Sequence, residues 1–138
     1  MSDDLPPNLI VAVTDDDESV RESLGSLLEF SGYTVRLFDS AAALLASGAL
    51  ADIDCLISDI DMPRMDGYEL ARHASVARPE LPVILVTGHH DLVNRRSRAR
   101  SPQPKILRKP FDVQELLTTL RLGMQRKLEK KNCTRTNR

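Results

Sequence analysis

The stretch CLISDIDMP, residues 55–63, decides how this sequence is expected to fold. An apolar run enters it, and two aspartates one residue apart, Asp59 and Asp61, end it. Continuous apolar runs are typical of parallel strands, because helices cover both faces of a parallel sheet. A strand that is suited to the interior but ends on concentrated negative charge indicates that the function lies at the end of the strand.

Similar apolar runs recur along the chain and alternate with segments whose apolar residues have helical spacing. We predict strands at residues 9–13, 33–38, 53–58, 82–86 and 105–108. Strands that alternate with helices imply right-handed crossovers and a parallel sheet, so the predicted fold class is α/β. The segment DLVNRRSRARSPQP (residues 91–104) has four arginines and two prolines, so we expect a fourth helix there to be short or irregular.

Length and composition limit the organisation of the chain. The 138 residues predict one domain, with an N-terminal arm at 1–8, a folded domain at 9–128 and a basic flexible tail at 129–138. The formal net charge of −1 argues against a bulk nucleic-acid binder. Apolar runs are far shorter than the ~20 residues of a membrane span, and the acidic N-terminus does not resemble a signal peptide. We therefore expect a cytoplasmic location and no membrane partner.

Other residues with reactive side chains have ordinary interpretations. Cys55 lies in an apolar run and Cys133 in a polar segment, which argues against a disulfide and a cysteine-based metal site. No suitably spaced third ligand accompanies the pair at 89–90, so we do not predict a transition-metal site at these histidines. The basic run Arg95–Arg100 is interpreted as a solvated face, with a docking surface for an acidic partner as the alternative.

Polar side chains stand at the ends of four predicted strands. The first strand ends on Asp15 and Asp16, the third on Asp59 and the fourth on Thr87, and the fifth runs into Lys109. Ligands of open parallel sheets bind beyond the carboxyl ends of the strands, so these side chains should meet at one edge. Carboxylates held close together raise one another's pKa, which indicates a hard cation among them. Oxygen ligands without cysteine favour Mg²⁺.

Lys109 and Thr87 extend this chemistry to phosphate. A lysine ammonium is a point-charge partner for phosphate, and a threonine hydroxyl can donate a hydrogen bond to a phosphoryl oxygen. The set suits a carboxylate that accepts a phosphoryl group while the metal and Lys109 stabilise the developing charge. The alternative is that the aspartates are helix caps and solvated turns, with Asp16 or Asp17 capping the first helix.

Four motifs follow one another along the chain: VTDDDESVRESL at 13–24, LISDIDMPRMDGYEL at 56–70, VILVTGH at 83–89 and ILRKPF at 106–111. Together they resemble the receiver domain of two-component response regulators, closest to the nodulation and nitrogen-fixation regulators. The resemblance extends from about residue 9 to residue 122. It implies a flavodoxin-like (βα)5 fold, with a five-stranded parallel sheet of order 2-1-3-4-5.

The resemblance also implies a role for each strand-end residue. Asp59 would be the phosphorylated aspartate, and Thr87 and Lys109 would contact the phosphoryl group. Mg²⁺ would be held by the carboxylates of Asp59, Asp15 and Asp16 and by the backbone carbonyl of Asp61. The bond between residues 109 and 110 would be a cis peptide.

By the same resemblance, the chain would be a signalling component and not a metabolic enzyme. A sensor histidine kinase or a phosphotransfer protein would donate the phosphoryl group, and the modified chain would switch the face that binds an unidentified downstream protein. A phosphorylation-linked dimer could accompany this step, and we expect no direct contact with nucleic acid.

One departure from the family pattern keeps alternatives open. Ile106 stands where most receivers carry Tyr or Phe, so the phosphorylation chemistry is better supported than the output mechanism. One alternative is a pseudo-receiver that binds partners without phosphorylation. The other is a haloacid-dehalogenase-type phosphatase, because Asp59 and Asp61 also match the acid pair of that class, although those enzymes need a larger cap or core.

Overall fold

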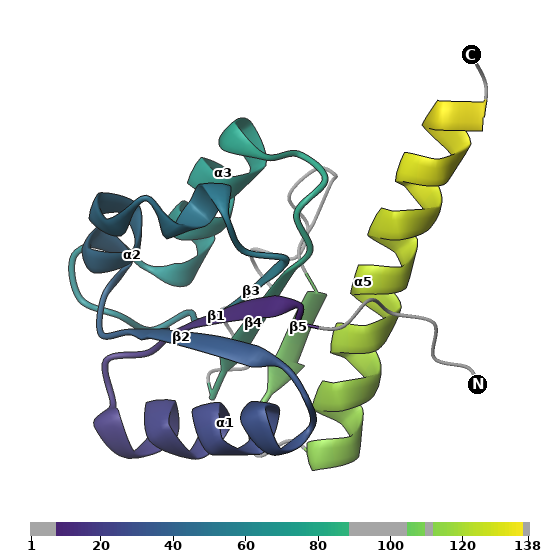
Figure 1. Cartoon of the computed structure of the whole chain (residues 1–138). Helices are drawn as coiled ribbons and strands as arrows, with labels where there is room; N and C mark the ends of the chain where they lie inside the picture. Colours follow the sequence, from purple (N-terminus) through teal and green to yellow (C-terminus); the bar gives the residue numbers. More distant parts are fainter. Residues whose placement is uncertain (1–7, 89–104, 110–111, 137–138) are drawn as a thin grey trace.

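Five short strands alternate with helices along the chain, as the apolar runs predict (Figure 1). The computed structural model describes residues 8–88, 105–109 and 112–136, with side chains described as far as residue 126. The strands are β1 (Ile10–Thr14), β2 (Thr34–Phe38), β3 (Cys55–Asp59), β4 (Val83–Thr87) and β5 (Lys105–Arg108). The helices are α1 (Glu18–Phe30), α2 (Ala41–Ser47), the short 3-10 helix η1 (Ala49–Ala51), α3 (Gly67–Ala77) and α5 (Val113–Thr136).

All five strands are parallel and form one sheet of order β2-β1-β3-β4-β5. The predicted flavodoxin-like arrangement is therefore confirmed. The central strand β3 is buried along its whole length, which explains why its sequence is a continuous apolar run.

Three strands extend one residue beyond their predicted ends, and each extra residue is polar. Thr14 pairs with Ser58 in the β1–β3 ladder, Asp59 pairs with Val86, and Thr87 pairs with Arg108. Backbone groups make these pairs, so the ladder continues after the apolar side chains have ended. The candidate site residues Asp59 and Thr87 are consequently part of the sheet and not of loops.

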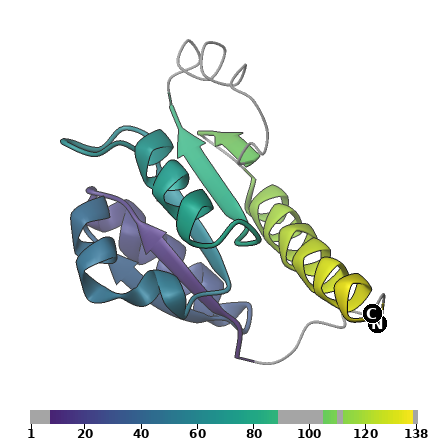
Figure 2. The same cartoon turned by 90° about the horizontal axis from the view of Figure 1, so that it is seen from above.

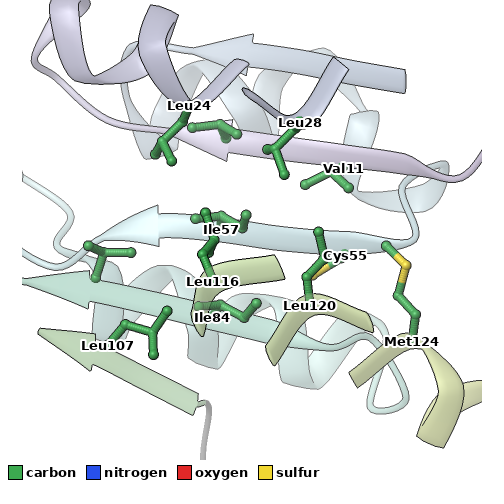
Figure 3. Packing of buried hydrophobic residues seen from close by; sticks show 12 residues of the cluster. Val11, Leu24, Leu28, Cys55, Ile57, Ile84, Leu107, Leu116, Leu120 and Met124 are labelled. Carbon is green, nitrogen blue, oxygen red and sulfur yellow. The ribbon is translucent and has the colours of Figure 1, made fainter. Parts of the chain in front are cut away.

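Helices cover both faces of the sheet (Figures 1 and 2). On one face, side chains of α1 and α5 pack against the strands, and Figure 3 shows this cluster. Its buried members include Leu28 from α1, Ile57 from β3 and Leu120 from α5. On the other face, α2 and α3 cover a second cluster that contains Leu44, Leu56 and Leu70.

Local sequence signals define several helix ends. Asp17 caps the start of α1, and Ser40 caps the start of α2. Asp66 and Glu69 form the predicted capping box at the start of α3. Gly48 adopts a left-handed conformation, with φ of 77°, at the end of α2, where glycine avoids the steric cost of a side chain.

Helix α5 is longer than the sequence pattern suggested. It continues to Thr136, through a segment that we predicted to be a flexible tail after residue 128. Figures 1 and 2 show that its C-terminal part projects past the sheet. Lys, Arg, Gln, Glu and Leu dominate residues 125–131 and favour helix, so the polar composition did not mark the end of the helix. The predicted fourth helix and the run Arg95–Arg100 lie outside the described residues.

Candidate functional site

The end of β3 holds Asp59 at the carboxyl rim of the sheet. Its carboxyl group belongs to a residue that is only 6% exposed. The backbone N–H of Ile60, the next residue, donates to the carbonyl of Val86 at 2.9 Å, so the ladder to β4 continues past Asp59. The residues before and after Asp59 are thus both hydrogen-bonded or paired with β4, which fixes the backbone that carries its side chain.

The turn after β1 holds two further acidic residues. Asp15 is buried, its backbone N–H donates to the carbonyl of Phe38 at 3.2 Å, and its Oδ1 accepts from the N–H of Asp17 at 2.9 Å. Asp17 caps α1 by accepting from the backbone of residues 19 and 20. The capping alternative therefore describes Asp17 and is wrong for Asp16, which is exposed beside the turn.

Three carboxylates from these two strand ends converge. Asp15, Asp16 and Asp59 each present an oxygen, and these oxygens lie within 4.8 Å of one another. The Nζ of Lys109, which follows β5, lies 3.3 Å from Oδ1 of Asp59. Four of the residues that the sequence assigned to one edge of the sheet therefore meet there.

Burial raises the pKa of the two least exposed carboxyl groups. For Asp59, loss of water is the largest cause; the positive charge of Lys109 opposes it, the charges of Asp15 and Asp61 add to it, and the pKa rises to about 6. For Asp15, burial again dominates, and its pKa is raised despite the hydrogen bond from Asp17. These groups would be stabilised as carboxylates by a bound cation.

The donor set fits Mg²⁺. The three side chains offer oxygen ligands without nitrogen or sulfur, and Mg²⁺ binds through one or two carboxylates while it keeps several waters. Asp16 is exposed, so the cluster reaches solvent on that side. Both the residue types and the separation of their oxygens are therefore suited to a divalent cation.

The ends of β4 and β5 are joined beside this cluster. Thr87 is the last residue of β4 and is fully buried. The backbone N–H of Lys109 donates to the carbonyl of Thr87 at 2.7 Å. Because Val86 pairs with Asp59, Thr87 lies one residue beyond it along the rim. Thr87 therefore ends β4, the strand next to that of Asp59, and Lys109 follows β5, the next strand of the sheet.

The start of α3 contains a residue, Gly67, that the sequence reasoning did not identify. The N–H of Gly67 donates to the carbonyl of Ile60 at 3.0 Å. A Cβ atom at position 67 would lie 2.6 Å from the carbonyl oxygen of Asp59, so only glycine permits this approach of α3 to β3. A glycine at the first position of a helix was the available signal, since glycine disfavours helix.

Some of the remaining positions that the sequence singled out lie among the described residues and others do not. Asp61 is half-buried, and its charge acts on Asp59. Cys55 is buried in β3 as expected. Ile106 packs against a small buried cluster that includes Tyr68 of α3. The two histidines at 89–90 and the proline at 110, with its predicted cis bond, lie outside the described residues.

Comparison with known proteins identifies the family. Residues 11–121 match the response regulator receiver domain family. The transcriptional regulatory protein FixJ of Azorhizobium caulinodans is 37% identical over 125 residues, which cover 91% of this chain and 59% of that protein. The response regulator MprA of Mycobacterium ulcerans is 37% identical over 120 residues, or 86% of this chain and 52% of MprA. The chain thus spans a little over half the length of these relatives.

Solved structures agree with this assignment. The signal receiver domain of an HD domain-containing protein from Pseudomonas fluorescens superposes with a TM-score of 0.82 and 27% identity, covering 93% of this chain and 95% of that one. The chemotaxis protein CheY4 of Vibrio cholerae has a TM-score of 0.74 and 26% identity, covering 84% of this chain and 98% of that one.

Within the described residues, no helix is both long enough and apolar enough to cross a membrane. The matched segment includes β1 from Val11 onward, the whole of β2 to β5, and both acidic strand ends. Receiver domains are signalling modules that act with sensor kinases in two-component systems. This chain belongs to the response regulator receiver domain family and is of the FixJ-like type.

Proposed function

We propose that this chain accepts a phosphoryl group on Asp59 from the phosphohistidine of a sensor histidine kinase or a phosphotransfer protein. One observation carries this proposal: the carboxylates of Asp15, Asp16 and Asp59 converge within 4.8 Å, and the ammonium of Lys109 lies 3.3 Å from Asp59. A nucleophile, a cation site and a fixed positive charge are thereby combined at one point on the rim.

In the proposed step, a carboxylate oxygen of Asp59 attacks phosphorus. The N–P bond of the donor breaks, an O–P bond forms, and the imidazole nitrogen that is left takes up a proton from solvent. The attack requires the ionised carboxylate, and positive charge that opposes the rise of the pKa of Asp59 to about 6 favours that form. Lys109 supplies part of that charge from within the chain.

Asp15, Asp16 and Asp59, with the backbone carbonyl of Asp61, would hold Mg²⁺, which would supply positive charge to offset the charge of the phosphoryl oxygens. Lys109 is already paired with Asp59 and can transfer that pairing to a phosphoryl oxygen. The hydroxyl of Thr87 donates to another phosphoryl oxygen. Both residues stabilise charge that develops during the transfer.

Phosphorylation would alter the face through which the chain binds a downstream protein, and it could promote a dimer. The FixJ relative is named a transcriptional regulatory protein, and this chain spans 59% of its length. We expect that this chain does not contact nucleic acid directly. The relative is longer than the segment matched here, and its name indicates a role in transcription.

The test is incubation with acetyl phosphate and Mg²⁺, followed by intact-mass measurement. Wild type should gain one phosphoryl group, and Asp59→Asn should gain none. Asp39→Asn is a matched control, because Asp39 follows the edge strand β2 and is exposed, and it should behave as wild type. Lys109→Ala should slow the transfer roughly 100-fold, as expected for loss of one charge-stabilising group.

Other results would contradict the proposal in distinct ways. A folded wild-type protein that gains no mass would favour a pseudo-receiver. Continuous turnover of a small phosphate ester would favour the phosphatase class. Phosphorylation of Asp59→Asn at the wild-type rate would show that the acceptor is another residue.

A further inference from the structure

Arg21 links helix α1 to the acidic turn that follows β1. It is half-buried in the first half of α1. Its Nη1 donates to the backbone carbonyl of Asp15 at 2.7 Å. Its own backbone N–H donates to the carbonyl of Asp17 at 2.9 Å. Arg21 therefore holds the turn from two sides, through its side chain and through the helix that carries it.

The bond from Arg21 to the Asp15 carbonyl restrains both acidic side chains of the turn. That carbonyl belongs to the peptide unit between Asp15 and Asp16, and a peptide unit is planar and rigid. Holding its oxygen limits ψ of Asp15 and φ of Asp16, and so limits the directions of both side chains. The other contacts of Asp15, from its N–H to Phe38 and from Asp17 to its Oδ1, do not restrain this peptide oxygen.

The charge of Arg21 should by itself oppose binding of a cation. A positive charge next to a site for a divalent ion lowers its affinity through repulsion. However, the guanidinium is bonded to a carbonyl, and Arg21 is not among the charges that shift the pKa of the Asp15 carboxyl. Geometry and charge thus predict opposite effects for its removal, so one measurement can separate them.

We propose that Arg21 is a positioning residue that holds the Asp15–Asp16 peptide unit so that both carboxylates converge with Asp59 on a divalent cation. This inference rests on the proposed function, because it assumes that the carboxylate cluster binds Mg²⁺. Groups that orient metal ligands without contacting the metal typically contribute 10–100-fold to metal affinity.

The experiment is a titration of the unphosphorylated protein with MgCl₂, in which the NMR chemical shifts of the backbone amides report binding. Arg21→Ala should bind Mg²⁺ about tenfold more weakly than wild type. Arg72→Ala is the control for loss of charge, because Arg72 is an exposed arginine on α3, and it should bind at least as tightly as wild type. Arg21→Lys keeps the charge and one donor and should recover part of the affinity.

A second measurement needs no metal. In metal-free Arg21→Ala, the amide resonances of Asp16 and Asp17 should move, while those of β4 should stay in place. Equal or tighter Mg²⁺ binding by Arg21→Ala, with these resonances unchanged, would overturn the inference. If Arg21→Ala does not fold, wild-type affinity and amide positions in Arg21→Gln would overturn it instead. Failure of wild type to bind Mg²⁺ would overturn the proposed function itself.

Discussion

The interior of the sheet and its carboxyl rim are built from the same strands but differ in what they bury. In the interior, Leu56 and Ile57 are almost fully buried among apolar side chains from helices on both faces. At the rim, the same strands bury the carboxyl groups of Asp15 and Asp59. They also bury the Thr14 hydroxyl, whose oxygen has no hydrogen-bond partner among the described residues.

This difference separates the source of stability from the source of function. Burial of apolar side chains stabilises the fold, whereas burial of charged or unpartnered polar groups costs free energy. The loop after β3 adds to that cost, because Arg64 has a φ of 71°, a conformation that disfavours residues with a side chain. The interior therefore holds in place a rim whose buried polar groups cost free energy.

The largest effect should come from the interior. Leu120→Ala removes a fully buried side chain of α5 and should lower the free energy of unfolding by about 3 kcal/mol, through lost apolar contacts and a cavity. Leu122→Ala on the same helix is the control, because Leu122 is 49% exposed and should matter little. Urea unfolding measures both. Equal losses would mean that α5 does not pack as described.

At the rim, substitution of Asp59 should raise the free energy of unfolding and not lower it. The pKa of Asp59 is about 6 in the folded chain and ~3.9 in an unfolded one, so the folded state binds more protons between these values. Metal-free wild type should therefore lose stability as the pH rises from about 4 to about 6. Asp59→Asn should lack the part of this loss that comes from Asp59, keep the part that comes from the buried Asp15, and exceed wild type at pH 7 by on the order of 2 kcal/mol.

Urea unfolding at several pH values without Mg²⁺ tests this prediction. Asp39→Asn should follow the wild-type profile, because that carboxyl group is exposed. Addition of Mg²⁺ should stabilise wild type at pH 7 and leave Asp59→Asn nearly unchanged. Parallel pH profiles for wild type and Asp59→Asn would mean that burial of this carboxyl group costs nothing.

The smallest effect should come from the backbone of the β3–α3 loop. Arg64→Gly removes the steric cost of the positive φ and should stabilise the protein by about 1 kcal/mol, since a left-handed residue with a Cβ costs roughly 1–2 kcal/mol. Arg64→Ala is the matched control, because it removes the exposed guanidinium but keeps the Cβ, and it should not stabilise. Equal stability of the two variants would show that the strain is absent.

Local patterns in the sequence were sufficient to locate the five strands of the described residues and to show that polar residues stand at their ends. Apolar runs identified all five strands, and the Asp66–Glu69 spacing identified the start of α3. Three strand ends were placed one residue early, because polar side chains interrupt the apolar pattern before backbone pairing stops. The end of α5 was missed for a related reason, since the polar sequence after residue 128 carries no apolar signal.

The sequence by itself determined that acidic, hydroxyl and ammonium groups stand at the ends of parallel strands, because an apolar run shows where each strand ends. Tertiary structure decided which of these groups meet. Strand register brings three carboxylates within 4.8 Å of one another. Helix packing places Gly67 against the backbone of Asp59 and Arg21 against the carbonyl of Asp15. Those contacts depend on how elements pack in space, and no local pattern of residues specifies that packing.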